Sequence, residues 1–380
     1  MHALLSTSVH STEDARIGAR RRQPRLIFDF IDGGAGRETA LAHNRSAFDP
    51  IKLDPKVLVD IENRSVASEI LGMETGVPFG VAPMGMCDLA WPGADAALGA
   101  AAIERGFPWC LSTAASMAIQ DAAKVAPGRS WFQLYVASSI DVAMELTQRA
   151  EDAGVEVLIL TVDVPAISRR TRDKRNGFQV PFKIGPRQLI DFALHPRWSL
   201  AQLSAGTPEM RNFGGSIGRF MREIGRGGVE WDFLDRLRDR WRGKIVVKGV
   251  MRPADAIRMR DAGVDAIWVS NHGGRQLDAA PATIDALPVI REAVGPGYPL
   301  IIDSGIRSGE DVVKCLALGA SFVMMGRPFL YALGAGGEKG LTEFLDVMTE
   351  EISTVMAQIG VTRIDDIGPH VLAGRGNERG

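Results

Sequence analysis

The segment WVSNHGGRQLDAAPATI, at residues 268–284, places two side chains suited to chemistry at the end of an apolar run. His272 and Arg275 follow the run and are separated only by Gly273 and Gly274. A histidine changes charge near neutral pH, whereas an arginine stays charged and can hold an anion through paired N–H groups. Glycines allow a sharp turn and a close approach of the backbone. The segment therefore predicts an imidazole and a guanidinium on one hinge.

Polar side chains also end several other apolar runs. A single buried polar residue, and a lone histidine above all, is most often a satisfied part of a core. A whole set at the same end of parallel strands is harder to explain in that way, because that end carries the active site in barrels of alternating strands and helices. The set consists of Gln133, Tyr135, Thr161, Asp163, Lys248, Ser270, Asn271, His272 and Asp303.

Two glycine-rich stretches, DSGIRSG and GRP, follow the last two apolar runs. They contain Arg307 and Arg327, and this is where barrel enzymes commonly bind a phosphate through backbone N–H groups and guanidinium groups. Surface ion pairing is the alternative role for these two arginines.

The apolar runs predict the fold. Most are separated by amphipathic stretches such as GADAALGAAAIERG and RPADAIRMRDAG, which have helical period and end in glycine. Eight repeats of strand and helix favour a closed α/β barrel, the (β/α)8 or TIM barrel, over an open doubly wound sheet. No G-x-G-x-x-G motif supports a dinucleotide-binding sheet. The runs cover residues 77–83, 108–112, 131–136, 155–163, 244–249, 264–271, 299–305 and 320–326.

Two segments lie outside these repeats within what we expect to be one domain, residues 1–380. Residues 1–76 precede the first strand, and FDFIDGGAG within them predicts a helix stopped by glycines, so we expect an N-terminal helical cap. An insertion at about residues 181–230 separates strands four and five and mixes apolar with basic residues. It is too long for an ordinary loop. Two roles for the insertion remain as alternatives: a lid packed on the barrel, and a surface that binds a membrane or a partner.

Composition narrows the class of protein. The 380 residues are 46% hydrophobic with a net charge of -2, which indicates a globular protein and argues against a nucleic-acid partner. The cysteines Cys87, Cys110 and Cys315 stand far apart and predict neither disulfides nor a metal site. No uncharged apolar segment is long enough to span a membrane, and the start does not resemble a secretion signal. We therefore expect an intracellular protein.

One motif indicates a different chemistry. GGSIG at residues 214–218 fits the G-x-S-x-G pattern of esterases, with Ser216 as nucleophile. In that fold a glycine loop precedes the nucleophile, whereas here the His272 segment follows it, and no apolar strand leads into Ser216. Chance in a glycine-rich insertion explains the match better.

The sequence resembles the family of FMN-dependent α-hydroxy-acid dehydrogenases and oxidases. The resemblance runs through nearly the whole chain, in PRLIFDFIDGGAG, WFQLYV, LTVDVP, IVVKGV, SNHGGRQLD, DSGIRSG and GRPFLY. SNHGGRQLD is the most specific of these motifs. LSTAASM and HPRWSL look like the mandelate dehydrogenase members of the family.

The resemblance implies roles in the oxidation of an L-2-hydroxy acid to a 2-oxo acid. His272 matches the active-site base, and Asp163 would orient its ring and stabilise the imidazolium. Arg275 and Arg170 match the arginines that bind the substrate carboxylate. Tyr135 would hydrogen-bond the substrate hydroxyl. Lys248 would lie by the flavin edge where negative charge accumulates on reduction.

The resemblance also implies FMN as the cofactor. The positions that match the family's contacts to the flavin ring are Ala82, Pro83, Met84, Ser112, Gln133, Thr161, Lys248 and Ser270. Those that match the ribityl and phosphate contacts are Asp303, Gly305, Arg307, Gly326 and Arg327.

Three departures bear on the substrate. Phe30 stands where the family usually has a tyrosine that binds the substrate carboxylate, and Ala114 stands where glycolate oxidase has a tryptophan. Gly85 matches the dehydrogenase-like members, whereas oxidases typically have an alanine. These residues favour a dehydrogenase for a larger or aromatic, mandelate-like acid. An L-lactate dehydrogenase, an oxidase and a non-catalytic flavin-binding barrel are the alternatives.

Partners and location follow from the same resemblance. The electron acceptor would be a quinone or O2, and family members are commonly tetramers, so we expect a homotetramer. We expect the protein in the cytoplasm or peripherally bound to the inner face of the membrane.

Overall fold

The eight apolar runs form a closed barrel of parallel strands. The computed structural model describes residues 8–136, 139–179, 182–213 and 230–374. Each barrel strand pairs with the next along the chain, and the last pairs with the first. The predicted (β/α)8 barrel is confirmed, and an open doubly wound sheet is excluded because the barrel has no free edge. The strands are β3 (Phe79–Met84), β4 (Trp109–Ser112), β5 (Ser130–Leu134), β6 (Val157–Thr161), β7 (Lys244–Val250), β8 (Ala266–Val269), β9 (Leu300–Ile302) and β10 (Phe322–Met325).

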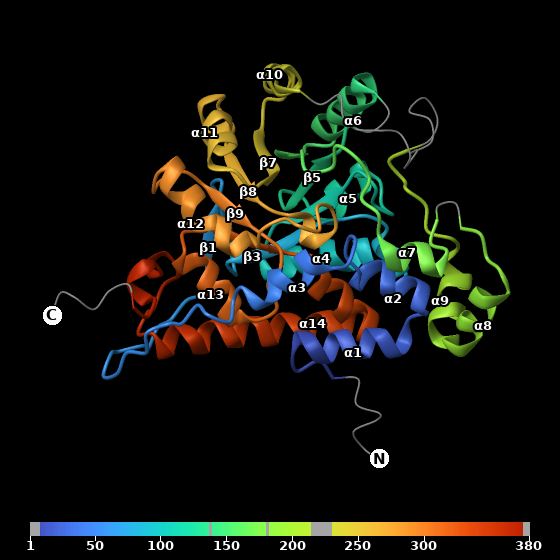
Figure 1. Ribbon diagram of the computed structural model, residues 1–380, viewed down its shortest axis with the longest axis horizontal. Coiled ribbons are helices and arrows are strands. Elements are labelled where there is room, and N and C mark those ends of the chain that lie inside the picture. The colour runs from blue at the N-terminus through green and yellow to red at the C-terminus, as the bar shows by residue number, and fades with distance from the viewer. Residues whose placement is uncertain (1–7, 137–138, 180–181, 214–229, 375–380) are drawn as a thin grey trace, which may run out of the picture.

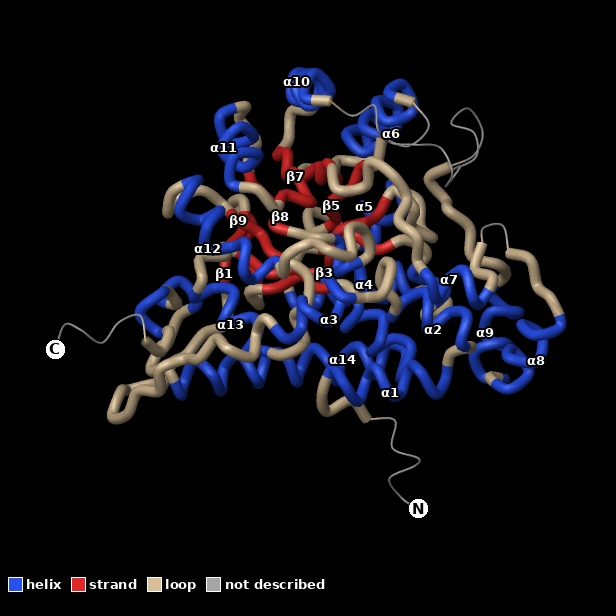
Figure 2. Tube along the Cα trace, in the orientation of Figure 1, coloured by secondary structure: helices blue, strands red, loops and turns tan. Residues whose placement is uncertain are grey.

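Helices surround the strands, as Figure 2 shows. They follow the strands in order as α4 (Ala94–Arg105), α5 (Ile119–Val125), α6 (Ile140–Asp152), α10 (Trp231–Arg240), α11 (Pro253–Asp261), α12 (Thr283–Val294), α13 (Gly309–Ala317) and α14 (Arg327–Gln358). Local sequence sets their ends. The Ser308 side chain accepts from the backbone N–H of Asp311 at the start of α13, and Gly106 ends α4 with a left-handed φ of 67°. Every residue of β5 and β6 is buried, because one face meets the barrel interior and the other meets helices.

A two-stranded hairpin closes the amino-terminal end of the barrel. β1 (Ser68–Ile70) and β2 (Met73–Thr75) pair antiparallel, a feature that the prediction of a helical cap did not include. Ile70 packs into the barrel interior with Trp131 and Trp268. Buried side chains therefore fill the barrel interior below the carboxyl ends of the strands.

The N-terminal helices cover the side and the mouth of the barrel. They are α1 (Thr12–Arg22), α2 (Arg25–Asp32) and α3 (Thr39–Ser46), and α1 lies along α14 in Figure 1. Asp32, at the end of α2, accepts from Arg16 at 2.7 Å and from the Tyr331 hydroxyl at 2.7 Å. These bonds join α2 to α1 and α14, so the end of α2 is held at the mouth.

The insertion between β6 and β7 contains α7 (Thr171–Asn176), α8 (Pro186–Leu194) and α9 (Pro196–Ala205). α8 and α9 project from the edge of the molecule, away from the strands, in Figure 1. Trp198 of α9 donates from Nε1 to the Leu89 carbonyl at 2.8 Å and so ties the insertion to the loop after β3. None of the helices in the described ranges could cross a membrane. The stretches GGSIG, with Ser216, and GRFMREIGRGG lie outside the described residues.

Candidate active site

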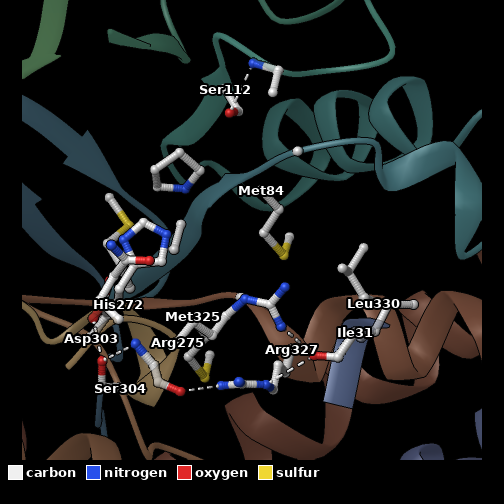
Figure 3. A pocket seen from close by; sticks show the side chains of 18 of the residues that line it. Ile31, Met84, Ser112, His272, Arg275, Asp303, Ser304, Met325, Arg327 and Leu330 are labelled. Carbon is white, nitrogen blue, oxygen red and sulfur yellow. Dashed lines mark hydrogen bonds between the residues drawn. The ribbon is translucent and has the colours of Figure 1, made fainter. Parts of the chain in front are cut away.

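A cavity opens where the strands end, and most of the predicted site residues form its wall, as Figure 3 shows in part. Four predicted residues lie beside the wall and are not part of it: Gln133, Thr161, Asp163 and Ser270. Gln133 accepts from Ser112 at 3.0 Å, and Thr161 pairs in register with Lys248. The predicted residues in the wall are Phe30, Ala82, Pro83, Met84, Gly85, Ser112, Ala114, Tyr135, Arg170, Lys248, His272, Arg275, Asp303, Gly305, Arg307, Gly326 and Arg327.

His272 lies between a carboxylate and a phenol. Its Nδ1 is 3.1 Å from Oδ1 of Asp163, and its Nε2 is 3.4 Å from the Tyr135 hydroxyl. Burial lowers the pKa of His272, although Asp163 opposes the shift. Burial alone would raise the pKa of Asp163, but the attraction of His272 and Lys248 holds it below its usual value. A neutral imidazole that donates Nδ1–H to an ionised carboxylate keeps a lone pair on Nε2, which can accept a proton.

The hinge that carries His272 is a left-handed turn. His272, Gly273 and Gly274 have φ of 59°, 64° and 71° and form the short helix η4 (His272–Gly274). A Cβ on Gly274 would lie 2.6 Å from the backbone nitrogen of Leu41 in α3. Glycine is therefore required at 274 both for its φ and for this contact. Because residue 272 is a histidine and not a glycine, its positive φ is strained, and strain of this kind is typical of functional sites.

Arg275 and Arg170 line the same cavity. Arg275 donates from Nη1 to the carbonyl oxygens of Phe30 at 2.8 Å and Gly33 at 2.9 Å, where α2 ends. Its guanidinium carbon lies 5.3 Å from the centre of the Phe30 ring. The orphan carbonyls at a helix end thus orient one guanidinium at the cavity wall. The positive charge of Arg170 adds to the lowering of the His272 pKa.

Lys248 belongs to a buried network with Ser270 and Asp303. Its Nζ donates to Ser270 Oγ at 2.6 Å and lies 2.9 Å from Oδ2 of Asp303. Ser270 donates in turn to Oδ1 of Asp303 at 2.7 Å. Burial would lower the pKa of Lys248, but the attraction of Asp303 and Asp163 outweighs it and raises the pKa. Lys248 therefore remains a cation that can stabilise negative charge in the cavity.

Arg307 and Arg327 form a second cationic group beside the start of α14. Arg327 donates to the Ile31 carbonyl at 3.0 Å, a bond visible in Figure 3. Burial, with repulsion from Arg327 and Arg45, lowers the pKa of Arg307 to about 10. Within the described part of the chain neither Arg307 nor Arg327 forms an ion pair with a carboxylate. Surface pairing, the alternative role, therefore does not account for them, and an anion would relieve their repulsion.

Apolar residues of the cavity were missed by sequence reasoning. Phe178 and Met210 come from the insertion, and Val164 and Ile167 come from the loop after β6. No quoted motif contains Phe178, Ile167 or Met210, and the contact of Phe178 with Phe30 of α2 depends on tertiary packing. Gly85 and Ala114 do meet as neighbours, since a Cβ on Gly85 would lie 3.2 Å from Cβ of Ala114.

Comparison with known proteins places the chain in a family. Residues 19–374 match the model of the FMN-dependent dehydrogenases, and the chain belongs to this family. (S)-mandelate dehydrogenase of Pseudomonas putida is 38% identical over 380 residues, which cover 98% of this chain and 96% of that protein. L-lactate dehydrogenase of Caulobacter sp. (strain K31) is 38% identical over 375 residues, which cover 96% of this chain and 98% of that protein. The resemblance found in the sequence is thus confirmed, and the protein is an oxidoreductase that acts on the CH–OH group of donors.

The fold agrees with that assignment. The crystal structure of the monotopic membrane protein (S)-mandelate dehydrogenase superposes with a TM-score of 0.91 at 38% identity, over 96% of this chain and 99% of that chain.

FMN is the cofactor of the family, and the site has the groups to hold it. Arg307 and Arg327, next to the amino terminus of α14, offer two positive charges for a phosphate. Two buried side-chain atoms at the strand ends, Gln133 Nε2 and Thr161 Oγ1, have no hydrogen-bond partner among the described residues. Buried polar groups are normally satisfied, so these atoms call for a polar ligand. The polar edge of a flavin ring has the donors and acceptors to satisfy both.

Proposed function

We propose that the protein oxidises an L-2-hydroxy acid with a large or aromatic side chain to the 2-oxo acid, with His272 as the base. The observation that supports this most strongly is the orientation of His272. Its Nε2 faces the cavity near Tyr135, while Nδ1–H donates a hydrogen bond to the Asp163 carboxylate. Bound FMN supplies the acceptor for the two electrons of the substrate.

The other polar residues position the substrate. Arg275 and Arg170 bind its carboxylate, and Tyr135 binds its hydroxyl group. Asp163 stabilises the imidazolium that forms when His272 takes the proton. Lys248 stabilises negative charge at the polar edge of the flavin ring. Each role is supported by the position of the side chain in or beside the wall of one cavity.

The preference for large acids rests on three positions. Phe30 lacks the hydroxyl that would add a donor for the substrate carboxylate. Gly85 and Ala114 both line the cavity and are smaller than the residues that related enzymes have there. A buried aromatic side chain recovers the lost affinity at about 25 cal/mol per Å² of apolar surface, whereas glycolate has none to bury.

Anaerobic mixing of the yellow protein with a panel of acids tests the function. We expect mandelate-like acids to bleach the flavin faster than lactate, and lactate faster than glycolate. A flavin that no 2-hydroxy acid bleaches would contradict the proposal and favour a non-catalytic flavin-binding barrel. Lactate as the best substrate would favour an L-lactate dehydrogenase.

We propose a quinone rather than O2 as the electron acceptor, since Gly85 matches the dehydrogenase-like members. Turnover should be faster with a soluble quinone analogue than with air alone. Faster turnover in air, with release of hydrogen peroxide, would instead identify an oxidase.

We also propose a homotetramer, which light scattering after gel filtration can test.

The α8–α9 region supports peripheral binding to the inner face of the membrane. Its exposed apolar side chains, with their exposed fractions, are Ile184 (56%), Leu189 (58%), Ile190 (64%), Leu194 (73%), Leu200 (64%) and Leu203 (79%). Exposed Lys183, Arg187 and Arg197 lie among them and suit anionic headgroups. The crystallised relative described above is itself called a monotopic membrane protein.

Flotation with vesicles containing anionic lipid tests this proposal. Leu194→Ser together with Leu203→Ser should reduce binding, whereas Val289→Ser, at a 54% exposed site on α12, should not. Equal flotation of all variants would contradict membrane binding through α8 and α9.

A further inference from the structure

Phe178, which follows α7 in the insertion between β6 and β7, forms part of the substrate cavity. We infer that Phe178 determines the preference for aromatic over small acids, by forming an aromatic wall with Phe30. The inference rests on the proposed oxidation of 2-hydroxy acids and assigns its selectivity to a residue that no sequence motif marks.

The end of α7 directs Phe178 toward the barrel. Gly177 follows the last residue of the helix and has a left-handed φ of 72°. The backbone N–H of Phe178 then donates to the Asp173 carbonyl at 2.8 Å, which closes the turn. The chain thereby reverses, and the Phe178 side chain is buried, with 7% of its surface exposed, at the cavity wall.

Polar contacts fix α7 against α2. Arg172 binds Asp32 at 2.7 Å and also pairs with Glu38. Asn176 donates to Asp29 at 2.7 Å. These contacts use charged and amide groups of both helices, so the distance between α7 and α2 is well defined. The wall is therefore preorganised before any substrate binds.

The two rings form one continuous surface. Phe30 and Phe178 lie parallel, with ring centres 4.1 Å apart and planes 6° from each other. Phe182 meets Phe178 edge to face, with centres 5.6 Å apart at 88°. Phe182 contacts Phe178 and is not part of the cavity wall.

The wall adjoins the anion-binding side chain. The Arg275 guanidinium carbon is 5.3 Å from the centre of the Phe30 ring. A substrate whose carboxylate binds Arg275 therefore has its side chain close to the wall. A phenyl group can stack on or meet these rings edge to face, whereas the methyl group of lactate offers little surface.

Phe178→Leu tests the inference, because leucine keeps an apolar side chain and removes the ring. We expect kcat/KM for mandelate to fall roughly tenfold, as for the loss of one aromatic contact, with the change mainly in KM. The value for lactate should change little. Phe182→Leu is the matched control, since it removes a ring of the same cluster that does not touch the cavity. FMN content and Tm report on folding, and Phe178→Met replaces the leucine variant if that variant fails to bind FMN.

Binding of unreactive acids gives a second measurement. Titration of the oxidised flavin spectrum with phenylacetate and acetate should show weaker phenylacetate binding in Phe178→Leu and unchanged acetate binding. A parallel loss for both acids would indicate a structural role and overturn the inference, as would no change or an equal effect in Phe182→Leu. A wild-type protein bleached by no 2-hydroxy acid is a separate result that overturns the proposed function as well.

Discussion

Replacing Asp163 by asparagine should slow flavin reduction by about 10³-fold while FMN stays bound. The carboxylate lies 3.1 Å from Nδ1 of His272 and stabilises the imidazolium that forms when Nε2 takes a proton. Two unit charges about 4 Å apart interact by about 4 kcal/mol at an effective dielectric constant of about 20. Each loss of about 1.36 kcal/mol in the transition state slows a reaction tenfold. For an imidazolium fully formed in the transition state, loss of the Asp163 charge therefore slows flavin reduction by about 10³-fold.

The assay is anaerobic stopped-flow reduction of the flavin by mandelate as a function of pH. Burial lowers the wild-type His272 pKa from its ordinary 6.5, and only the neutral ring accepts a proton. The rate should thus rise with pH through that pKa and then level off. Asp163 raises this pKa, so Asp163→Asn should move the rise to lower pH.

Asp95→Asn is the matched control for loss of a buried carboxyl group. Burial and Asp88 raise the pKa of Asp95 to about 7, and its carboxyl accepts from the Ser116 N–H at 2.8 Å, an acceptor that asparagine retains. The control should keep both the wild-type rate and its pH profile. An Asp163→Asn rate within about tenfold of wild type, or an unmoved pH profile, would refute the reasoning about His272.

Three further predictions address the base, the phosphate and the substrate. His272→Ala should retain FMN but lose about 10²–10⁴-fold in the rate of flavin reduction, and near-normal rates would exclude it as the base. Replacement of both Arg307 and Arg327 by glutamine should give colourless protein after gel filtration, whereas full FMN occupancy would place the phosphate elsewhere. Phe30→Tyr should restore a donor worth about 1–3 kcal/mol and improve kcat/KM for glycolate and lactate more than for mandelate. An unchanged ranking in steady-state assays would contradict that interpretation of Phe30.

Much of the scaffold could be predicted because its signals are local. Apolar runs bounded by turn residues marked all eight barrel strands, and strand order followed from the short connections of parallel barrels. The polar residues at the strand ends converge on one cavity for the same reason. The β1–β2 hairpin was missed because its three-residue strands carry too little periodicity to be recognised.

The contacts between side chains of the site could not be predicted from the sequence, because they depend on the closed barrel and its N-terminal helices. The hinge at Gly273 and Gly274 was evident from residue types, since few other residues tolerate such a turn. That Nδ1 rather than Nε2 of His272 meets Asp163 depends on how β6 and β8 are placed around the barrel. The stacking of Phe30 on Phe178 likewise joins segments about 150 residues apart, through contacts of α7 with α2 that no local pattern encodes. Sequence alone determined the strands, the hinge and the kinds of reactive groups, because backbone preferences and hydrophobic burial act over a few residues. Tertiary structure decided the tautomer-setting partner of the histidine and the shape of the substrate wall, because both depend on distances between elements that only packing sets.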